Sequence, residues 1–250
     1  MNLKAIKQQF PESASEIEAL ENLGFTTRQP GWLNNLDLDK AMTACWLLGK
    51  IGDDQDADVL VNLLAGQRSE LWMQAAASLS SIMTQRHLSS LLSILETSSD
   101  PAQRESVVYA LSFQLDSQIA SHVIRVLTDI ATNRVEAPSV RAQALEGLGN
   151  QLSQELFSQE LSASSSQYQE TVSAILQALD DSETVIRFWA CFAVGRLKIE
   201  EALPKLQLLA QSDKTHVEGG WSVSEEAEDA ITLINGEEPP LRQPCKSLAT

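Results

Sequence analysis

The amino-acid sequence predicts an all-α protein, an α-α superhelix of about five helix pairs with further helices at both ends. Three observations predict this fold class. Helix-sized apolar stretches alternate with polar turns from residue 37 onward, their first helices align with one another, and no long stretch has the period-two alternation of a strand. Stacked helix pairs of this kind form a solenoid.

The predicted elements divide the chain into three parts. Residues 1–36 hold two short capping helices, at 2–10 and 14–25, and a loop. Residues 37–236 form the repeats, and residues 237–250 form a Pro-rich tail that we expect to be disordered. The predicted helix pairs are 41–52 with 59–66 (joined by the polar turn 53–58), 69–83 with 86–97, 101–115 with 118–131, 138–152 with 168–179 and 184–199 with 202–210, followed by an unpaired helix at 223–234.

The first helices of the pairs align on an anchor residue. The anchors are Leu48, Leu79, Leu111, Leu148, Val194 and Ile231. Four residues before the anchors stand the small or β-branched residues Ala44, Ala75, Val107, Ala144, Ala190 and Ala227. Small side chains are expected where two helices approach closely. An arginine stands seven residues before the anchor in three consecutive repeats, at Arg104, Arg141 and Arg187.

Three stretches carry a resemblance to a known family: VRAQALEGLG at 140–149, IRFWACFAVG at 186–195 and CWLLGKIGD at 45–53. They resemble HEAT repeats, and in particular the short bacterial HEAT-like repeats of the phycobilisome lyase type. The resemblance extends over residues 37–235 and implies a solenoid fold. It indicates function only weakly, because such repeats occur in scaffolds, regulators, lyase subunits and a few DNA-repair enzymes. Repeats two and three depart from the pattern, with Trp72 in place of the arginine and with Ser80 and Ser112 in place of the glycine.

The charge balance limits the partners. Lys and Arg total 18 against 34 Asp and Glu, a net charge of −16, which repels nucleic acid and anionic membranes and favours basic partners. The three widely separated cysteines predict neither a disulfide framework nor a zinc site. The chain starts without an apolar leader and holds no membrane-length apolar run, so we expect a cytoplasmic protein.

No catalytic motif is recognisable. The histidines His87, His122 and His216 lie in different repeats without metal-ligand spacing, and no phosphate-binding loop or nucleophile motif occurs. We therefore expect no catalytic residues, no metal and no cofactor, and an enzyme is the less favoured class.

The arginine column has two interpretations. Asp100 precedes Arg104 by four residues, and Glu183 precedes Arg187 by four, which places each acid on the same helix face as its arginine. These residues, with Arg141, are predicted to form a structural ladder along the stack. The alternative is that the arginines bind an anionic ligand or a phosphorylated partner.

Trp189 is the most informative candidate for binding. Its column otherwise holds Thr43, Gln74, Ser106, Gln143 and Glu226, residues of a solvated face. An exposed ring there, with Phe188 or Phe192 beside it, could anchor a partner, since aromatic residues dominate interface energies. The alternative is that the insertion at 151–167 folds over the ring. Phe192 also shares a column with Trp46 and Tyr109, where packing within the stack is the competing interpretation.

Two further regions are candidates for contact with a partner. The insertion at 151–167, rich in Ser and Gln, is either a binding loop or a tolerated surface loop. Residues 200–238 hold ten acids against two lysines, a net charge of −8, which suits either a basic partner or a solvated end cap.

Two functions remain. The first is a non-catalytic scaffold or adaptor that binds a protein or peptide, with Arg86, His122 and Arg125 on the second helices facing a groove. The second, implied by the resemblance alone, is a subunit of a bilin lyase or of phycobilisome turnover, which requires an aromatic-lined cleft for a tetrapyrrole. A DNA glycosylase of the HEAT type is opposed by the charge of −16.

Overall fold

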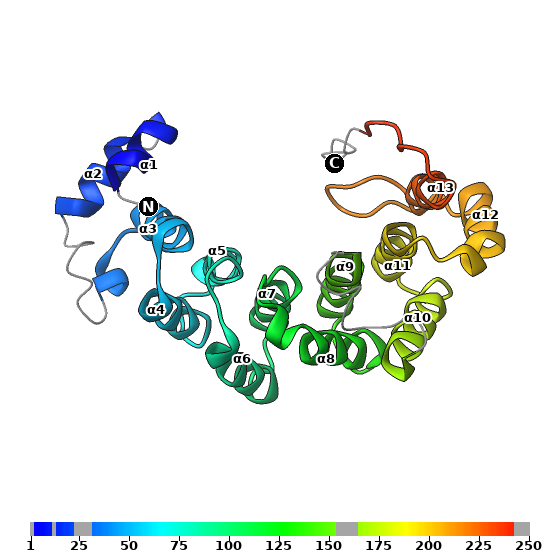
Figure 1. Cartoon of the computed structure of the whole chain (residues 1–250), viewed down its shortest axis with the longest axis horizontal. Coiled ribbons are helices and arrows are strands. Elements are labelled where there is room, and N and C mark those ends of the chain that lie inside the picture. Colours follow the sequence, from blue (N-terminus) through cyan, green and yellow to red (C-terminus); the bar gives the residue numbers. More distant parts are fainter. Residues whose placement is uncertain (1–2, 12–13, 23–31, 154–164, 243–250) are drawn as a thin grey trace. The chain divides into compact units, whose positions relative to one another are not determined.

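The computed structural model describes residues 3–11, 14–22, 32–153 and 165–242 (Figure 1). Within these ranges the regular elements are α-helices and short 3-10 helices, without a named strand, so the predicted all-α fold class is confirmed. The chain divides into two compact units, Met1–Asp116 and Ser117–Thr250. Each unit is described by itself.

The first unit contains seven α-helices within its described residues. They are α1 (Leu3–Gln9), α2 (Ala14–Asn22), α3 (Leu38–Ile51), α4 (Asp54–Leu64), α5 (Trp72–Leu79), α6 (Gln85–Thr97) and α7 (Pro101–Ser112). In this unit α5 packs between α3 and α7, while α4 packs against α6 in a second layer (Figure 1). This arrangement is the alternation of first and second helices that the sequence predicts.

The polar run at 53–58 corrects one predicted boundary. Only Asp53 lies outside a helix, and α4 begins directly after it. The Asp53 carboxylate accepts hydrogen bonds from the backbone N–H groups of Gln55 and Asp56, and the Asp56 carboxylate accepts one from Asp53. These acids satisfy free donors at the helix start and complement its positive dipole end, so they begin a helix instead of forming a turn.

The second unit contains six α-helices within its described residues. They are α8 (Ala120–Thr132), α9 (Pro138–Ser153), α10 (Ser166–Ala178), α11 (Thr184–Leu197), α12 (Leu203–Ser212) and α13 (Val223–Ile234). Here α11 packs between α9 and α13, α8 contacts α10, and α12 contacts α13 (Figure 1). The helix predicted at 223–234 has the observed bounds of α13.

Close approach between first helices explains the small residues of the repeat. All six residues of the small column, from Ala44 to Ala227, are fully buried. A Cβ atom at Gly149 would lie 3.0 Å from the Cα atom of Ala193, and one at Gly195 would lie 2.8 Å from that of Ala230. These distances leave no room for a side chain, so glycine permits the contacts of α9 with α11 and of α11 with α13.

The column expected to be solvated is partly buried, which corrects the sequence interpretation. Ser106, Gln143 and Glu226 are only 2%, 8% and 5% exposed, whereas Thr43, Gln74 and Trp189 are half-buried. The reason is that a first helix has helical neighbours on more than one side, as α11 has α9, α10 and α13. Such a helix buries a wider face than one apolar stripe.

The insertion and the tail lie largely outside the described residues, which omit 154–164 and 243–250. At the edges of the insertion, α9 continues to Ser153 and α10 begins at Ser166. In the tail, the guanidinium of Arg242 donates to Asp229 at 2.7 Å and to Glu228 at 3.0 Å, so this residue is held on α13. The Pro-rich composition of residues 237–250 predicts disorder and does not reveal this contact of Arg242.

Candidate partner-binding site

A pocket of about 680 Å³ lies in the second unit, between α9, α11, α13 and the loop 213–222 that joins α12 to α13. Four aromatic residues line it: Phe188, Trp189, Phe192 and Trp221. The first three turns of α11 supply three of these rings, and the loop, orange in Figure 1, supplies Trp221. The pocket therefore combines a helix surface with a loop that is distant in sequence.

The four rings contact one another in a chain. Trp189 meets Phe188 at a centroid distance of 5.4 Å and Phe192 at 5.2 Å, both nearly perpendicular. Phe188 also contacts Trp221, with ring centroids 5.8 Å apart. Edge-to-face contacts of this kind hold rings in defined orientations. Phe188 is buried and Trp189 is half-buried, so the pocket presents an oriented indole.

The loop 213–222 is folded back by its own backbone. The N–H groups of Ser224 and Val223 donate to the carbonyls of Asp213 and Thr215, at 2.8 and 2.9 Å. At the tip Val217 N–H donates to Trp221 O, and Gly219 has a φ of +70°, a conformation that favours glycine. These contacts return the chain to the pocket, where Trp221 completes the aromatic lining.

Carboxylates dominate the polar part of the lining. Glu226 is buried, and its Oε2 accepts a hydrogen bond from the Trp221 indole N–H at 2.7 Å. Glu146 is half-buried and accepts a hydrogen bond from the Gln143 amide at 2.8 Å. Glu183 and Glu218 also line the pocket. Among the described lining residues there is no Lys or Arg, and His216 is the sole potential cation.

Burial raises the pKa of two of these acids. It raises the pKa of Glu226 to about 7, with a further rise from Asp229, while the hydrogen bond from Trp221 acts in the opposite direction. Burial also raises the pKa of Glu146, against the hydrogen bond from Gln143. Desolvation disfavours the charged form of a carboxyl group. A cation in the pocket would restore part of the stabilisation that both acids lose.

The structure brings together three of the six residues that the sequence suggests for partner binding, namely Phe188, Trp189 and Phe192. Sequence reasoning missed Trp221, Glu146 and Glu226. Glu226 occupies the same repeat position as Trp189, and this shared position is the signal that could have placed it at the site. A polar residue at that position instead suggests a solvated face. Trp221 and Glu146 carry no periodic signal that would place them beside Trp189.

His122 and Arg125 lie elsewhere, exposed on α8, and neither lines the pocket. Within the described ranges no hydrogen-bond or ion-pair partner is found for either side chain, so both remain predicted contact residues. Arg86, in the first unit, has partners within that unit. It pairs with Asp58 and donates to the carbonyl oxygen of Asp54 at 2.9 Å.

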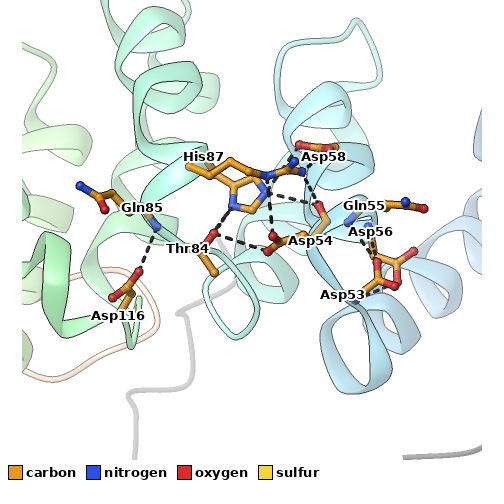
Figure 2. Close-up of polar contacts among 10 residues, drawn as sticks. Asp53, Asp54, Gln55, Asp56, Asp58, Thr84, Gln85, His87 and Asp116 are labelled. Carbon is orange, nitrogen blue, oxygen red and sulfur yellow. Dashed lines mark hydrogen bonds and ion pairs between the residues drawn. The ribbon is translucent and has the colours of Figure 1, made fainter.

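Figure 2 shows the polar cluster around His87, where α6 begins beside α4. The His87 Nδ1 accepts a hydrogen bond from Thr84 N–H at 3.0 Å. This bond leaves Nε2 as the protonated nitrogen, 3.3 Å from the carbonyl oxygen of Asp54. The ring is 2% exposed. His87 therefore caps α6 and links it to α4. These contacts give the histidine a structural role that requires no bound ligand.

The three arginines of the column bind carbonyl groups at the end of the preceding second helix or in the turn that follows it. Arg104 donates to Leu95 and to Ser98, the latter at 3.1 Å, and Arg141 donates to Ala131 at 3.2 Å. Arg187 donates to Asp181 and Ser182 at 2.8 and 2.9 Å. Such bonds satisfy carbonyls left free at the ends of the second helices.

The carboxylate partners differ from those that the spacing predicts. Arg141 pairs with Asp181 at 2.6 Å, and Arg187 pairs with Asp213 at 2.7 Å. Asp213, from the turn after the next second helix, stands in the place predicted for Glu183. The Asp100 carboxylate accepts hydrogen bonds from Ala102 and Gln103 N–H and caps α7. The acid that stands four residues before the arginine lies just outside the helix. There its carboxylate can cap the helix start, and this capping competes with an ion pair to the arginine.

The described part of the chain offers neither a cluster of metal-binding side chains nor a reactive thiol. Within it no group of three or more His, Cys, Asp and Glu side chains is arranged to hold a metal ion. Cys45 and Cys191 are buried, and burial raises the pKa of both thiols, that of Cys45 to about 12. A protonated, buried thiol is a poor nucleophile. No described helix has the length and apolarity needed to cross a membrane.

Part of the second unit, with the end of α8 at its start, is similar to a known family of repeats. Residues 124–221 match the family described as HEAT repeats. An engineered protein of known crystal structure is 21% identical, with a TM-score of 0.47 over 82% of this chain and 94% of that chain. A designed armadillo repeat protein in complex with the peptide (KR)4 is 20% identical, with a TM-score of 0.44 over 81% of this chain and 96% of that chain. The curated proteins give no match.

Proposed function

We propose that this protein is a non-catalytic scaffold or adaptor that binds a protein or peptide partner at the pocket around Trp189. One observation carries the proposal: four aromatic side chains converge on a pocket of about 680 Å³, and one of them is a half-buried tryptophan. Partly exposed tryptophans in preformed pockets supply a large share of the energy at protein interfaces. Helical repeats commonly present such surfaces to peptides.

The contacts of the other candidate residues support this choice of site. Arg141 and Arg187 are engaged by carboxylates and carbonyls of their own unit, which favours a structural role for the arginine column. Arg86 is likewise paired. Trp189 differs because its ring contacts other rings at the edge of an open pocket.

The second candidate is a bilin lyase or phycobilisome-turnover subunit, as the resemblance to that repeat type implies. The aromatic lining of the pocket favours it, since a tetrapyrrole requires such walls. The charge of the lining opposes it, because a bilin carries two propionates and would meet four glutamates without a Lys or Arg among the described lining residues. Incubation with a bilin and an apo-phycobiliprotein should therefore give no new visible absorbance.

Selection from a random peptide library on the full-length protein tests the proposal. We expect enriched peptides whose affinity falls about tenfold or more in Trp189→Ala, the loss typical of an aromatic hot spot. Leu208→Ala is the matched control, because Leu208 is an apolar residue of the same unit, 55% exposed on α12 and outside this pocket. Circular dichroism verifies that both variants remain folded. Peptides that bind wild type and Trp189→Ala equally would contradict the proposal.

A further inference from the structure

The pocket around Trp189 has a chemistry that selects among partners. Its lining joins apolar side chains to carboxylates from three elements: Glu146 from α9, Glu183 at the start of α11 and Glu226 from α13. An anionic ligand would be repelled by these groups. An uncharged apolar ligand would fill the pocket and leave Glu146 and Glu226 desolvated without compensation, which costs free energy.

A cationic side chain satisfies both parts of the pocket. Its methylene groups can lie against the aromatic rings while its charged end reaches a carboxylate. Guanidinium groups also stack on indole faces and bind carboxylates through two parallel hydrogen bonds. Trp189 and Trp221 supply the indoles, and Glu226 is joined to Trp221 by a hydrogen bond of 2.7 Å, so ring and carboxylate stand side by side.

We infer that this pocket binds an arginine side chain presented by a basic segment of the partner. The inference rests on the proposed function, because it names the chemistry of the occupant of the same site. Trp189 and Trp221 provide the stacking surface, and Glu226 and Glu146 provide the negative charge.

Two further observations agree with a basic partner. Residues 200–238 carry a net charge of −8, so the region that contains the loop and α13 attracts cations over a longer range. The same helix already binds a guanidinium of this chain. Arg242 donates to Asp229 and Glu228 and lies 3.4 Å from Glu225. The acids of α13 are thus able to hold an arginine.

The charge of Glu226 gives the site a dependence on pH. Because burial raises its pKa to about 7, Glu226 loses its negative charge as the pH falls from 8 to 6, and binding of a cation should weaken. The groups around it are Asp229, Glu225 and Arg242 at α13, Cys191 on α11, and the pocket residues Glu146, Glu183, His216 and Glu218. A variant at Glu226 isolates the contribution of this carboxyl group to the pH dependence.

The test compares two probes on the full-length protein by titration of tryptophan fluorescence. One probe is N-acetyl-arginine methylamide, and the other is its citrulline analogue, in which an uncharged urea replaces the guanidinium. At pH 8 we expect the arginine probe to bind wild type about tenfold more tightly. The preference should fall to about twofold in Glu226→Gln, which removes the charge and keeps an acceptor for Trp221. Leu208→Ala should retain the preference.

The outcomes separate this inference from the proposed function. Equal affinity for the two probes, no binding of the arginine probe, or a full preference in Glu226→Gln would each overturn the arginine pocket. If the library then yields uncharged peptides that need Trp189, the proposed function stands and only the inference fails. If no peptide needs Trp189, the proposed function fails as well.

Discussion

Glu226 shows how a single residue connects the stability of the fold with the site. Its carboxyl group is buried beside an apolar pocket and accepts a hydrogen bond from Trp221. In the unfolded chain its pKa would be near 4.5, the ordinary value for a glutamate, whereas burial raises the pKa to about 7 in the folded protein. The folded state therefore binds the proton more tightly, and the stabilisation from this proton is lost as the pH rises through this range.

This shift predicts the behaviour of Glu226→Gln. Because glutamine has no charge to desolvate, we expect the stability of the variant relative to wild type to rise by about 2 kcal/mol in total between pH 5 and 7, a slope that stays below the limit of about 1.4 kcal/mol for each pH unit. Urea unfolding at pH 5, 6, 7 and 8 measures the change. Glu200→Gln, at an exposed position, is the control for the loss of one negative charge. Parallel pH profiles for the two variants would show that Glu226 is not desolvated.

At the residue scale, the sequence identifies part of the site. Trp189 is recognisable because an aromatic residue stands in a column of polar residues. Glu226 is not, since its burial depends on α11 and on loop 213–222, which no repeat pattern predicts. The spacing also does not predict the carboxylates that pair with Arg141 and Arg187, for a similar reason. Asp181 and Asp213 come from turns 40 and 26 residues further along the chain, beyond the helical spacing that suggests Glu183.

At the scale of elements, the contact between first helices depends on glycine. Gly195 faces Ala230 so closely that an added Cβ atom would lie 2.8 Å from its Cα atom and 3.0 Å from its Cβ atom. Backbone of α11 or α13 would have to move to admit even a methyl group.

We therefore expect Gly195→Ala to destabilise the protein by about 1–3 kcal/mol, although alanine is the better helix former. Chemical denaturation measures the loss. The control is Gln207→Ala, at an exposed position of α12, which should change stability by no more than about 0.5 kcal/mol. A Gly195→Ala variant as stable as wild type would mean that α11 and α13 are further apart than the structure shows.

The sequence predicts helices better than the connections between them. Alternating apolar and polar faces locate each of the helices from α3 to α13, and α13 is predicted with its observed bounds. The predicted helix at 101–115 ends earlier, at Ser112. The periodic pattern predicts helices at 202–210 and 223–234 and says nothing about the loop 213–222 between them. Its shape comes from backbone bonds such as Val217 N–H to Trp221 O, for which the sequence offers only the Gly219–Gly220 pair as a hint.

At the scale of the whole molecule, the repeat pattern predicts one continuous array, and the structure has two compact units that meet in sequence at Asp116 and Ser117. No column of the repeat marks this boundary. The site belongs entirely to the second unit. The net charge of −16 favours basic partners for the molecule. The carboxylates that line the pocket are the place where we expect such a partner to bind.

Indole NMR tests most directly the claim that this pocket is the binding site. The protein has five tryptophans, at positions 32, 46, 72, 189 and 221, and single Trp→Phe variants assign their indole N–H signals. On titration with a library-selected peptide, we predict that the signals of Trp189 and Trp221 shift while those of Trp46 and Trp72 stay in place. Binding that shifts Trp46 or Trp72 and leaves Trp189 and Trp221 unchanged would contradict the assignment of the site.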